Sequence, residues 1–299
     1  MTSNIKIYFF LALCVLFWSG NFVIGRFISG GVEPLELAFF RWLFVCIFLL
    51  PSLLFLDLKK IFNYLKTNLL FFILISFLGI TLFNTIVYIA LQSTKATNAL
   101  LINSIVPILI LILSFLILKT KITKIQVGGI VLSTIGVVFL VLKGDFFKIF
   151  EIEFNKGDLW ILLSSTVWAL YSVVLKFKPK GIKHLELFVI IVYLGFLLLL
   201  PWYLSQGFTL EKEIMIFKQN WYFFIYVSFF ASLLSFYFWH MGIENIGAER
   251  TGQFTHLMPI FGAILAYIFL DERLEYYHII GALLIGFGIY LSLFLKKVD

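Results

Sequence analysis

Ten long apolar segments divide the chain, and they constrain its fold more than any other feature of the sequence. Nine of them contain no Asp, Glu, Lys or Arg, and the tenth is interrupted only by Arg41. About 20 mostly apolar residues in a helix cross the hydrocarbon core of a bilayer, and a helix satisfies its own backbone groups there. The sequence therefore predicts an all-α integral membrane protein with ten transmembrane helices. The segments are residues 7–25, 37–56, 67–94, 96–118, 125–142, 159–175, 187–210, 219–243, 251–270 and 276–295.

The composition excludes a soluble globular protein and a disordered chain. Hydrophobic residues make up 62% of the 299 residues and charged residues 13%, whereas soluble domains have about 45–50% and about 25%. The net charge of +7 arises from Lys and Arg in short connections, so it does not indicate nucleic-acid binding. Cys14 and Cys46 lie inside apolar segments without metal-binding spacing, so we expect no metal site, no disulfide and no cofactor.

The distribution of basic residues predicts the orientation in the membrane. If the N-terminus is cytoplasmic, the inner connections hold 14 Lys and Arg and the outer connections hold 8. Short cytoplasmic loops are enriched in these residues. We therefore expect a multi-pass protein of the cytoplasmic (inner) membrane with both termini in the cytoplasm, and we interpret segment 7–25 as the first helix rather than as a signal peptide.

The second half of the chain repeats the first. An offset of 150 residues aligns Glu36 with Glu186, and after a two-residue insertion an offset of 152 holds from residue 72 to residue 136. The expected domains are a first repeat at 1–145, a linker at 146–156 and a second repeat at 157–299. Five helices per repeat is an odd number, so the second copy would be inverted in the membrane, as in many transporters. Duplication without mechanical meaning is the alternative.

Five stretches of the chain carry motifs of a known family. They are Trp18 to Phe22, Phe40 to Trp42, Ala96 to Pro107, Ala248 to Pro259 and Asp271 to Leu274. In these stretches the sequence resembles the drug/metabolite transporter superfamily in its ten-helix EamA-type branch. The resemblance implies a central cavity between two five-helix bundles and secondary transport of small organic solutes, often export of amino acids or related metabolites. The first half has Lys119, Thr120 and Lys121 where the family often has an acidic turn.

Arg41 is the most informative candidate for the substrate cavity. A charged side chain in hydrocarbon costs about 2.5–3.5 kcal/mol on insertion scales and marks a function by default. Its repeat counterpart is Ile191, so the fold itself does not require a charge at this position. Arg41 would bind a substrate carboxylate; an ion pair, a gating role or a snorkelling side chain are the alternatives.

Other polar and aromatic residues fall at similar depths in the predicted helices. Trp18 and Trp168 are repeat counterparts near the middle of the membrane and would wall the cavity, with plain packing as the alternative. His240 and His256 would couple transport to protons or be structural. For the Asn residues, hydrogen bonding between helices is the alternative role. The remaining cavity candidates are Asn21, Asn84, Tyr88, Asn103, Tyr171 and Thr255.

Proline and glycine residues recur at equivalent positions in the two repeats. Pro107 and Pro259 are expected to kink helices and to act as hinges. The glycines would allow close packing of helices within the bundle or in a dimer. These glycines are Gly129, Gly136, Gly281 and Gly288.

The sequence thus predicts a secondary transporter of small organic metabolites, most simply an exporter of amino acids or related compounds. A multidrug or lipid-linked carrier of the same fold is the alternative. We expect no enzymatic activity and no catalytic residue, because the chain has no nucleotide-binding loop and no H-E-x-x-H motif. The expected partners are a small-molecule substrate and the lipid bilayer, with possible proton coupling, no nucleic acid, and a monomeric or homodimeric state.

Overall fold

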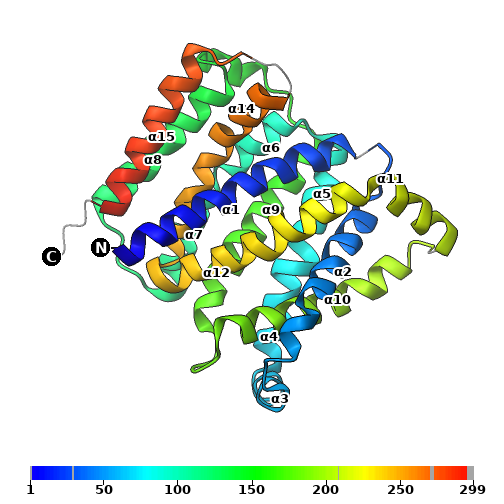
Figure 1. Cartoon of the computed structure of the whole chain (residues 1–299). Coiled ribbons are helices and arrows are strands. Elements are labelled where there is room, and N and C mark those ends of the chain that lie inside the picture. Colours follow the sequence, from blue (N-terminus) through cyan, green and yellow to red (C-terminus); the bar gives the residue numbers. More distant parts are fainter. Residues whose placement is uncertain (1, 29, 208, 270–272, 295–299) are drawn as a thin grey trace.

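The fold is all-helical in the computed structural model, which describes residues 2–28, 30–207, 209–269 and 273–294 (Figure 1). Within these ranges no residue is assigned to a strand. The elements of the first half are α1 (Thr2–Phe27), α2 (Pro34–Leu53), α3 (Leu58–Thr67), α4 (Leu69–Ser76), η1 (Phe77–Leu82), α5 (Phe83–Ser93), α6 (Ala96–Asn103), α7 (Val106–Leu113), η2 (Ser114–Leu118) and α8 (Lys124–Val141). The remaining elements are η3 (Phe146–Glu151), α9 (Lys156–Val174), η4 (Leu175–Phe177), α10 (His184–Leu204), α11 (Leu210–Ser228), η5 (Phe229–Leu234), α12 (Ser235–Ile246), α13 (Ala248–Gly252), η6 (Gln253–Leu257), α14 (Met258–Phe269) and α15 (Tyr276–Phe294).

Nine helical segments in the described ranges are long and apolar enough to cross a bilayer. The segment expected at 251–270 is divided among α13, η6 and α14, and residue 270 lies outside the described ranges. The total of ten transmembrane helices therefore stays a prediction. The expected linker 146–156 contains η3 and ends at the first residue of α9.

The eighth helical segment is longer than its apolar residues suggest. The sequence places its start near residue 219, but α11 begins at Leu210 and continues through η5 and α12 to Ile246. The charged residues of 210–218 form the first turns of α11. Glu211 and Glu213 in the first turn are favourable there, because anionic side chains stabilise a helix N-terminus.

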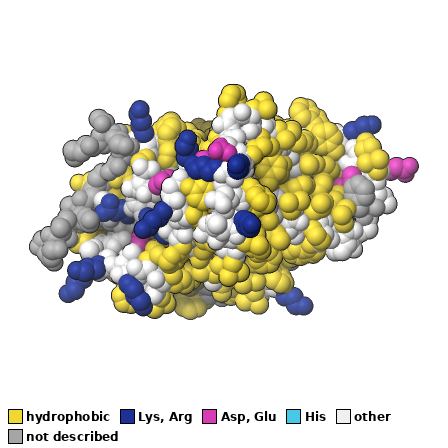
Figure 2. Space-filling view, turned by 90° about the horizontal axis from the view of Figure 1, so that it is seen from below, with side chains coloured by type: hydrophobic (Ala, Val, Ile, Leu, Met, Phe, Trp, Pro, Cys, Tyr) yellow, Lys and Arg dark blue, Asp and Glu magenta, His cyan; other side chains and the backbone are white. Residues whose placement is uncertain are grey.

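Apolar side chains cover much of the outside of the molecule. Figure 2 shows a face on which yellow apolar side chains predominate. Large apolar residues on the outside of the molecule include Leu70, which is 81% exposed, and Leu283, which is 68% exposed. A soluble monomer rarely exposes large contiguous apolar patches, whereas lipid favours them. The surface therefore fits a bilayer.

Helices α8 and α15 pack closely through the small residues that the sequence singled out (Figure 1). A Cβ added to Gly129 would lie 2.5 Å from the carbonyl oxygen of Gly288, and one added to Gly281 would lie 2.8 Å from Cβ of Leu140. Contact residues with higher numbers in α8 meet contact residues with lower numbers in α15, so the two helices are antiparallel. These glycines serve a packing contact within one chain.

The two halves also contact each other reciprocally. Helix α5 packs on α9, and their counterparts α12 and α1 pack on each other; α7 packs on α9, and their counterparts α14 and α1 do the same. Two copies related by a two-fold axis would make such reciprocal contacts. The inversion of the second copy stays a prediction.

Two π-helical segments occupy equivalent places in the two halves. Segment η1 covers 77–82 and segment η5 covers 229–234, which is the offset of 152 residues that the sequence repeat predicts. Short π-helical segments inside α-helices are rare and are frequent at functional sites. Sequence reasoning missed both of them, because a π-turn has no reliable residue signature.

The hinge prolines lie directly after interruptions of their helices. Helix α6 ends at Asn103, and Pro107 lies in the first turn of α7. Pro259 follows the 3-10 segment η6 and lies in the first turn of α14. The interruption before Pro107 lies inside the helical segment Asn98–Leu118, where a proline kink would place it. Whether these interruptions are hinges stays a prediction.

Candidate functional site

A small pocket among the first helices of both halves contains most of the expected cavity residues. We call it the Arg41 pocket. Its volume of about 20 Å³ is enough for roughly one water molecule, so the site is closed in this structure. Its lining comprises Trp18, Asn21, Phe22, Arg41, Phe83, Asn84, Val87, Asn103, Trp168, Thr255 and Met258.

Arg41 lies in α2 and is 1% exposed. Its Nη1 donates to Oδ1 of Asn21 at 3.2 Å and to the hydroxyl of Tyr88 at 2.7 Å. Its Nη2 donates to the carbonyl oxygen of Ala231 in η5 at 2.9 Å. The hydroxyl of Tyr88 also donates to Oδ1 of Asn21 at 2.9 Å. The guanidinium is thus fixed in position by neutral acceptors from three helices.

The charge of Arg41 has no counter-ion in the described part of the chain. None of the four ion pairs found there includes it. Its Nε has no hydrogen-bond partner, and its Cζ lies 5.4 Å from the ring centre of Trp42 and 6.0 Å from that of Phe236. Aromatic faces attract cations but compensate only part of the cost of burying one. The pocket therefore favours an incoming anion.

The two tryptophans of the pocket contact each other. The rings of Trp18 and Trp168 contact edge to face with their centres 5.1 Å apart. The indole N–H of Trp18 donates to the carbonyl oxygen of Ala231 at 3.0 Å, whereas the N–H of Trp168 is buried without a partner. Trp168 therefore offers a second donor to a ligand.

The acceptor that organises this site is a backbone group, which sequence reasoning missed. The carbonyl oxygen of Ala231, within η5, accepts from both Trp18 and Arg41. Its repeat counterpart Gly79, within η1, accepts from Nδ2 of Asn84 at 3.2 Å. A π-turn leaves carbonyl oxygens available that an α-helix would use itself.

The pair Asn21 and Tyr88 has an equivalent in the second half. Their counterparts Tyr171 and His240 form a hydrogen bond between the tyrosine hydroxyl and Nε2. The ring of Tyr171 also packs on that of Trp168, with ring centres 5.0 Å apart. No arginine joins this second pair, because Ile191 stands where the first half has Arg41.

Asn103 and Thr255 are two further polar residues of the pocket. Nδ2 of Asn103 donates to the sulfur of Met258 at 3.4 Å, and Oδ1 of Asn103 accepts from Ser165 at 3.3 Å. Thr255 donates to the carbonyl oxygen of Gly252 at 2.8 Å. The bonds of Asn103 link α6 to α14 and to α9, whereas the bond of Thr255 lies within its own segment. Sequence reasoning could have identified Phe83, Val87 and Met258 as lining residues, since they lie within a turn of Asn84 or Thr255.

His256 does not line the Arg41 pocket. Its Nδ1 lies 2.7 Å from the hydroxyl of Ser133, and its Nε2 lies 2.9 Å from the carbonyl oxygen of Ser104. Both ring nitrogens are therefore used in a buried contact among α8, η6 and the break after α6. The helix break before Pro107 frees the Ser104 region for this contact, which spacing in the sequence could not show.

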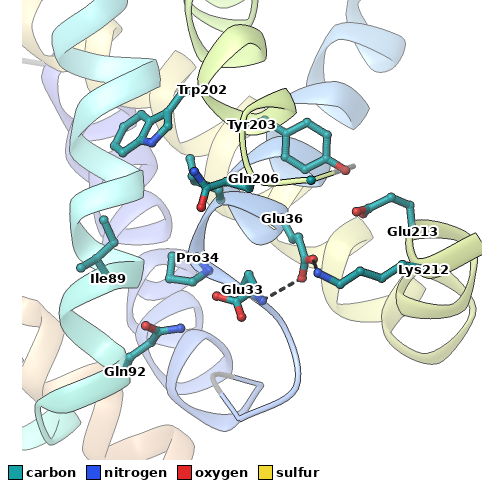
Figure 3. A pocket seen from close by; sticks show the side chains of 12 residues that line it. Glu33, Pro34, Glu36, Ile89, Gln92, Trp202, Tyr203, Gln206, Lys212 and Glu213 are labelled. Atoms are coloured by element: carbon teal, nitrogen blue, oxygen red, sulfur yellow. Dashed lines mark hydrogen bonds and ion pairs between the residues drawn. The ribbon is translucent and has the colours of Figure 1, made fainter. Parts of the chain in front are cut away.

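A larger pocket lies where α2 and α11 begin and where α5 and α10 end (Figure 3). We call it the Glu36 pocket, and its volume is about 400 Å³. Glu36 and Lys212 form an ion pair, and the carboxylate of Glu213 points toward Tyr203 (Figure 3). The charged residues in its lining are Glu33, Glu36, Lys212 and Glu213.

A third pocket lies where α10 begins and where α12 ends. We call it the Glu244 pocket, and its volume is about 130 Å³. Its charged and titratable residues are Lys176, Lys178, His184, His240 and Glu244.

The three pockets follow one another along the helix axes. Helix α10 contributes His184 to the Glu244 pocket and Tyr203 to the Glu36 pocket, and 19 residues of helix between them span about 28 Å. Helix α2 contributes Glu36 to one pocket and Arg41 to the Arg41 pocket. The Arg41 pocket therefore lies between two openings at opposite ends of the bundle.

Two ion pairs connect the halves reciprocally near these ends. Glu36 of the first half pairs with Lys212 of the second, and Glu186 of the second half pairs with Lys60 of the first at 3.0 Å. Glu36 aligns with Glu186 at the offset of 150, and Lys60 aligns with Lys212 at the offset of 152. The hydrogen bond from Lys60 to Glu186 raises the pKa of the Lys60 ammonium.

Each glutamate of these ion pairs is fixed by its own helix. A carboxylate oxygen of Glu36 accepts from the backbone N–H of Glu33 at 2.8 Å, and Glu186 accepts likewise from that of Lys183 at 2.8 Å. These capping bonds hold the carboxylates at the first turns of α2 and α10. The lysines, on α11 and α3, are the movable partners.

The fold and the apolar surface define a polytopic helical membrane protein of the transporter class. The chain belongs to the EamA-like transporter family, whose model matches it twice, at residues 5–142 and 155–294. Transporters of this kind carry a small molecule across a membrane.

Relatives in bacteria and archaea share nearly the whole chain. It is 28% identical to the uncharacterized transporter YyaM of Bacillus subtilis (strain 168), over 96% of this chain and 93% of that protein. It is 26% identical to an uncharacterized transporter of Archaeoglobus fulgidus, over 97% of this chain and 98% of that protein. A crystal structure with 16% identity has the same fold, with a TM-score of 0.73 and coverage of 98% of both chains.

Proposed function

We propose that this protein is a secondary transporter of small organic carboxylates, amino acids and related compounds among them, and that it exports them across the cytoplasmic membrane. The observation that carries the proposal is the buried Arg41, which no carboxylate of the described chain neutralises. Its Nε and the N–H of Trp168 are buried donors without partners. A substrate carboxylate supplies the missing charge and acceptors, because guanidinium and carboxylate groups match in geometry.

Transport proceeds in the proposal by alternating access between two inverted five-helix halves. The antiparallel contact of α8 with α15, which are repeat counterparts, supports the inversion. The reciprocal ion pairs support a two-fold relation between the halves. With the predicted orientation, the Glu36 pocket opens to the outside and the Glu244 pocket opens to the cytoplasm. Rocking of one half against the other would expose the Arg41 pocket to each side in turn.

The character of the Arg41 pocket supports a polar substrate over a lipid or a lipophilic cation. Amide, guanidinium and hydroxyl groups of Asn21, Arg41, Asn84 and Thr255 line it together with aromatic rings. A lipophilic cation would meet the charge of Arg41 unshielded by any carboxylate in that lining. Transport of such compounds is the alternative outcome of the experiment below.

The test is binding followed by transport with purified protein. A thermal-shift screen against amino acids, other carboxylates, amines, sugars and lipophilic cations identifies ligands, because a ligand that binds the folded state raises the melting temperature. The best ligand is then used for counterflow in proteoliposomes. Variants Arg41→Ala and Arg41→Lys are compared with Ile191→Ala, the equivalent position in the second half.

Arg41→Ala is expected to lose carboxylate-dependent stabilisation and counterflow. Truncating one partner of a buried charge pair costs about 2–5 kcal/mol, which weakens binding by about 30-fold or more. Arg41→Lys keeps the charge but not the planar donor pair, so its loss should be smaller. Ile191→Ala should bind normally. Unchanged carboxylate counterflow by folded Arg41→Ala would refute the carboxylate site, and stabilisation only by lipophilic cations would replace the substrate class.

A further inference from the structure

The Glu244 pocket contains an arrangement of donors that the proposed transport cycle has not used. Lys178 and His184 contact a carboxylate there, Lys176 donates to the carbonyl oxygen of Ile243 at 3.1 Å, and His240 closes the inner wall. We infer that the Glu244 pocket is a second binding site for a carboxylate group, at which the substrate docks before it reaches Arg41. This inference rests on the proposed function for its place in transport, but its binding chemistry stands on separate residues.

The pocket already holds a carboxylate, that of Glu244. Lys178 Nζ lies 2.6 Å from Oε1 of Glu244, and Nδ1 of His184 lies 3.4 Å from Oε2. The Glu244 side chain is 44% exposed, so it is held at the mouth of the pocket and can swing into solvent. Exposed ion pairs contribute about 1 kcal/mol or less, so a substrate carboxylate can take the place of Glu244 at small cost.

His240 has a ring nitrogen that no residue in the described part of the chain contacts by a hydrogen bond. It is 2% exposed and lines the pocket, and its Nδ1 has no hydrogen-bond partner. Its Nε2 is bonded to the hydroxyl of Tyr171. When that hydroxyl donates to Nε2, the proton of the neutral ring lies on Nδ1. A buried N–H without an acceptor is costly, and a docked carboxylate oxygen satisfies it.

The equivalent pocket at the other end has the opposite charge. With neutral histidines, the Glu244 pocket has two lysines and one glutamate, whereas the Glu36 pocket has three glutamates and one lysine. His184 aligns with Pro34, so α2 has no equivalent of this histidine. Nε2 of His184 donates to the carbonyl oxygen of Tyr237 at 3.1 Å, so its Nδ1 donates to a carboxylate when the ring is protonated. The fold therefore does not require the basic character of the Glu244 pocket, which suits an anionic ligand.

The size and position of the pocket suit a docking step. Its volume of about 130 Å³ accommodates a carboxylate and a small attached group, unlike the closed Arg41 pocket of about 20 Å³. Tyr171 connects the two sites, because it is bonded to His240 and packs on Trp168 of the Arg41 pocket. With the predicted orientation, a cytoplasmic carboxylate meets Lys178 and His184 first and Arg41 second.

Histidine NMR of the purified full-length protein tests this site without any transport assay. The chain has four histidines: His184 and His240 in the pocket, and His256 and His278 elsewhere. Isotope-labelled histidine gives four sets of ring signals. Each set is assigned to its residue by substituting the histidines one at a time. Benzoate is titrated as the probe, and benzamide, its neutral isostere, is the matched control ligand.

Benzoate is expected to shift the signals of His184 and His240 saturably, while those of His256 and His278 stay in place. Benzamide should shift none of them. Lys178→Gln should weaken the benzoate response several-fold, whereas Glu244→Gln should strengthen it several-fold by removing the resident carboxylate. Lys180→Gln, an exposed neighbour that does not line the pocket, is the control variant.

The result also separates the second site from the first. If the His184 and His240 signals respond to benzoate in Arg41→Ala as in the natural chain, the Glu244 pocket binds carboxylate by itself, whatever the transported substrate is. No response of these signals to benzoate, or an equal response to benzamide, would overturn the inference and leave the role of Arg41 untouched. A response lost in folded Arg41→Ala would assign the binding to the Arg41 pocket alone.

Discussion

The two reciprocal ion pairs should bias the transporter in opposite directions when each is removed. Lys212→Gln breaks the pair with Glu36 near the Glu36 pocket, and Lys60→Gln breaks the pair with Glu186 near the other end. In the proposed mechanism the first pair holds the outer opening closed and the second holds the inner opening closed. Loss of the first should therefore favour the outward-open state, and loss of the second the inward-open state.

The expected size follows from the exposure of the charges. The lysine side chains are 47% and 36% exposed, while their glutamate partners are 6% and 4% exposed. Solvent screening limits the half-exposed pair of Glu36 with Lys212 to about 0.5–1 kcal/mol. That free energy changes the ratio of two conformations by about 2–5-fold.

Accessibility of a single cysteine in the Arg41 pocket measures this ratio. Val87 lines the pocket and is 3% exposed, so Val87→Cys reacts only when the pocket opens. The background carries Cys14→Ala and Cys46→Ala, and a membrane-impermeant thiol reagent is added outside right-side-out vesicles. Lys212→Gln should raise the labelling rate by about 2–5-fold, and Lys60→Gln should lower it by a similar factor.

The control is Lys218→Gln, an exposed lysine on the same helix as Lys212, which should leave the rate unchanged. Changes of the same sign for Lys212→Gln and Lys60→Gln would refute the reciprocal-gate reasoning. Equal rates in all variants would show that neither ion pair contributes to closure.

Two further substitutions test packing and the buried histidine. Gly288→Val should destabilise the protein by about 1–3 kcal/mol and lower its melting temperature, because the added Cβ would lie 2.5 Å from the carbonyl oxygen of Gly129. The control is Gly286→Val, where an added Cβ meets nothing within 4 Å. Equal melting temperatures of the two variants would contradict the packing account. His256→Phe should destabilise the protein by about 1–3 kcal/mol, since it leaves the carbonyl of Ser104 without its partner and the hydroxyl of Ser133 with only its bond to Ile130, yet leave the pH profile of transport unchanged. A shifted profile in a well-folded variant would instead make His256 a coupling residue.

Much of the fold follows from the sequence because membrane insertion depends on local composition. An apolar run of sufficient length predicts a spanning helix whatever its neighbours are, so nine of the expected segments correspond to helices long enough to span. The repeat could also be read from residue identities, and the offset of 152 residues that aligns Pro107 with Pro259 also aligns η1 with η5. The inversion and the tenth span stay predictions.

The membership of the site was partly predictable for the same reason. Arg41 and the asparagines were recognised because polar groups are costly in lipid and must face the interior of the bundle. Seven of the expected residues line the Arg41 pocket: Trp18, Asn21, Arg41, Asn84, Asn103, Trp168 and Thr255.

Only the tertiary structure decided which group meets which. The carbonyl of Ala231 is an acceptor for Arg41 because η5 departs from α-helical geometry, and His256 is tied to Ser104 because the chain breaks between α6 and α7. The ion pairs of Glu36 with Lys212 and of Glu186 with Lys60 join residues more than a hundred positions apart. By itself, the sequence determines which segments enter the membrane, because that depends on composition within about 20 residues. The pairing of side chains across helices depends on how the two halves pack, which no local pattern contains.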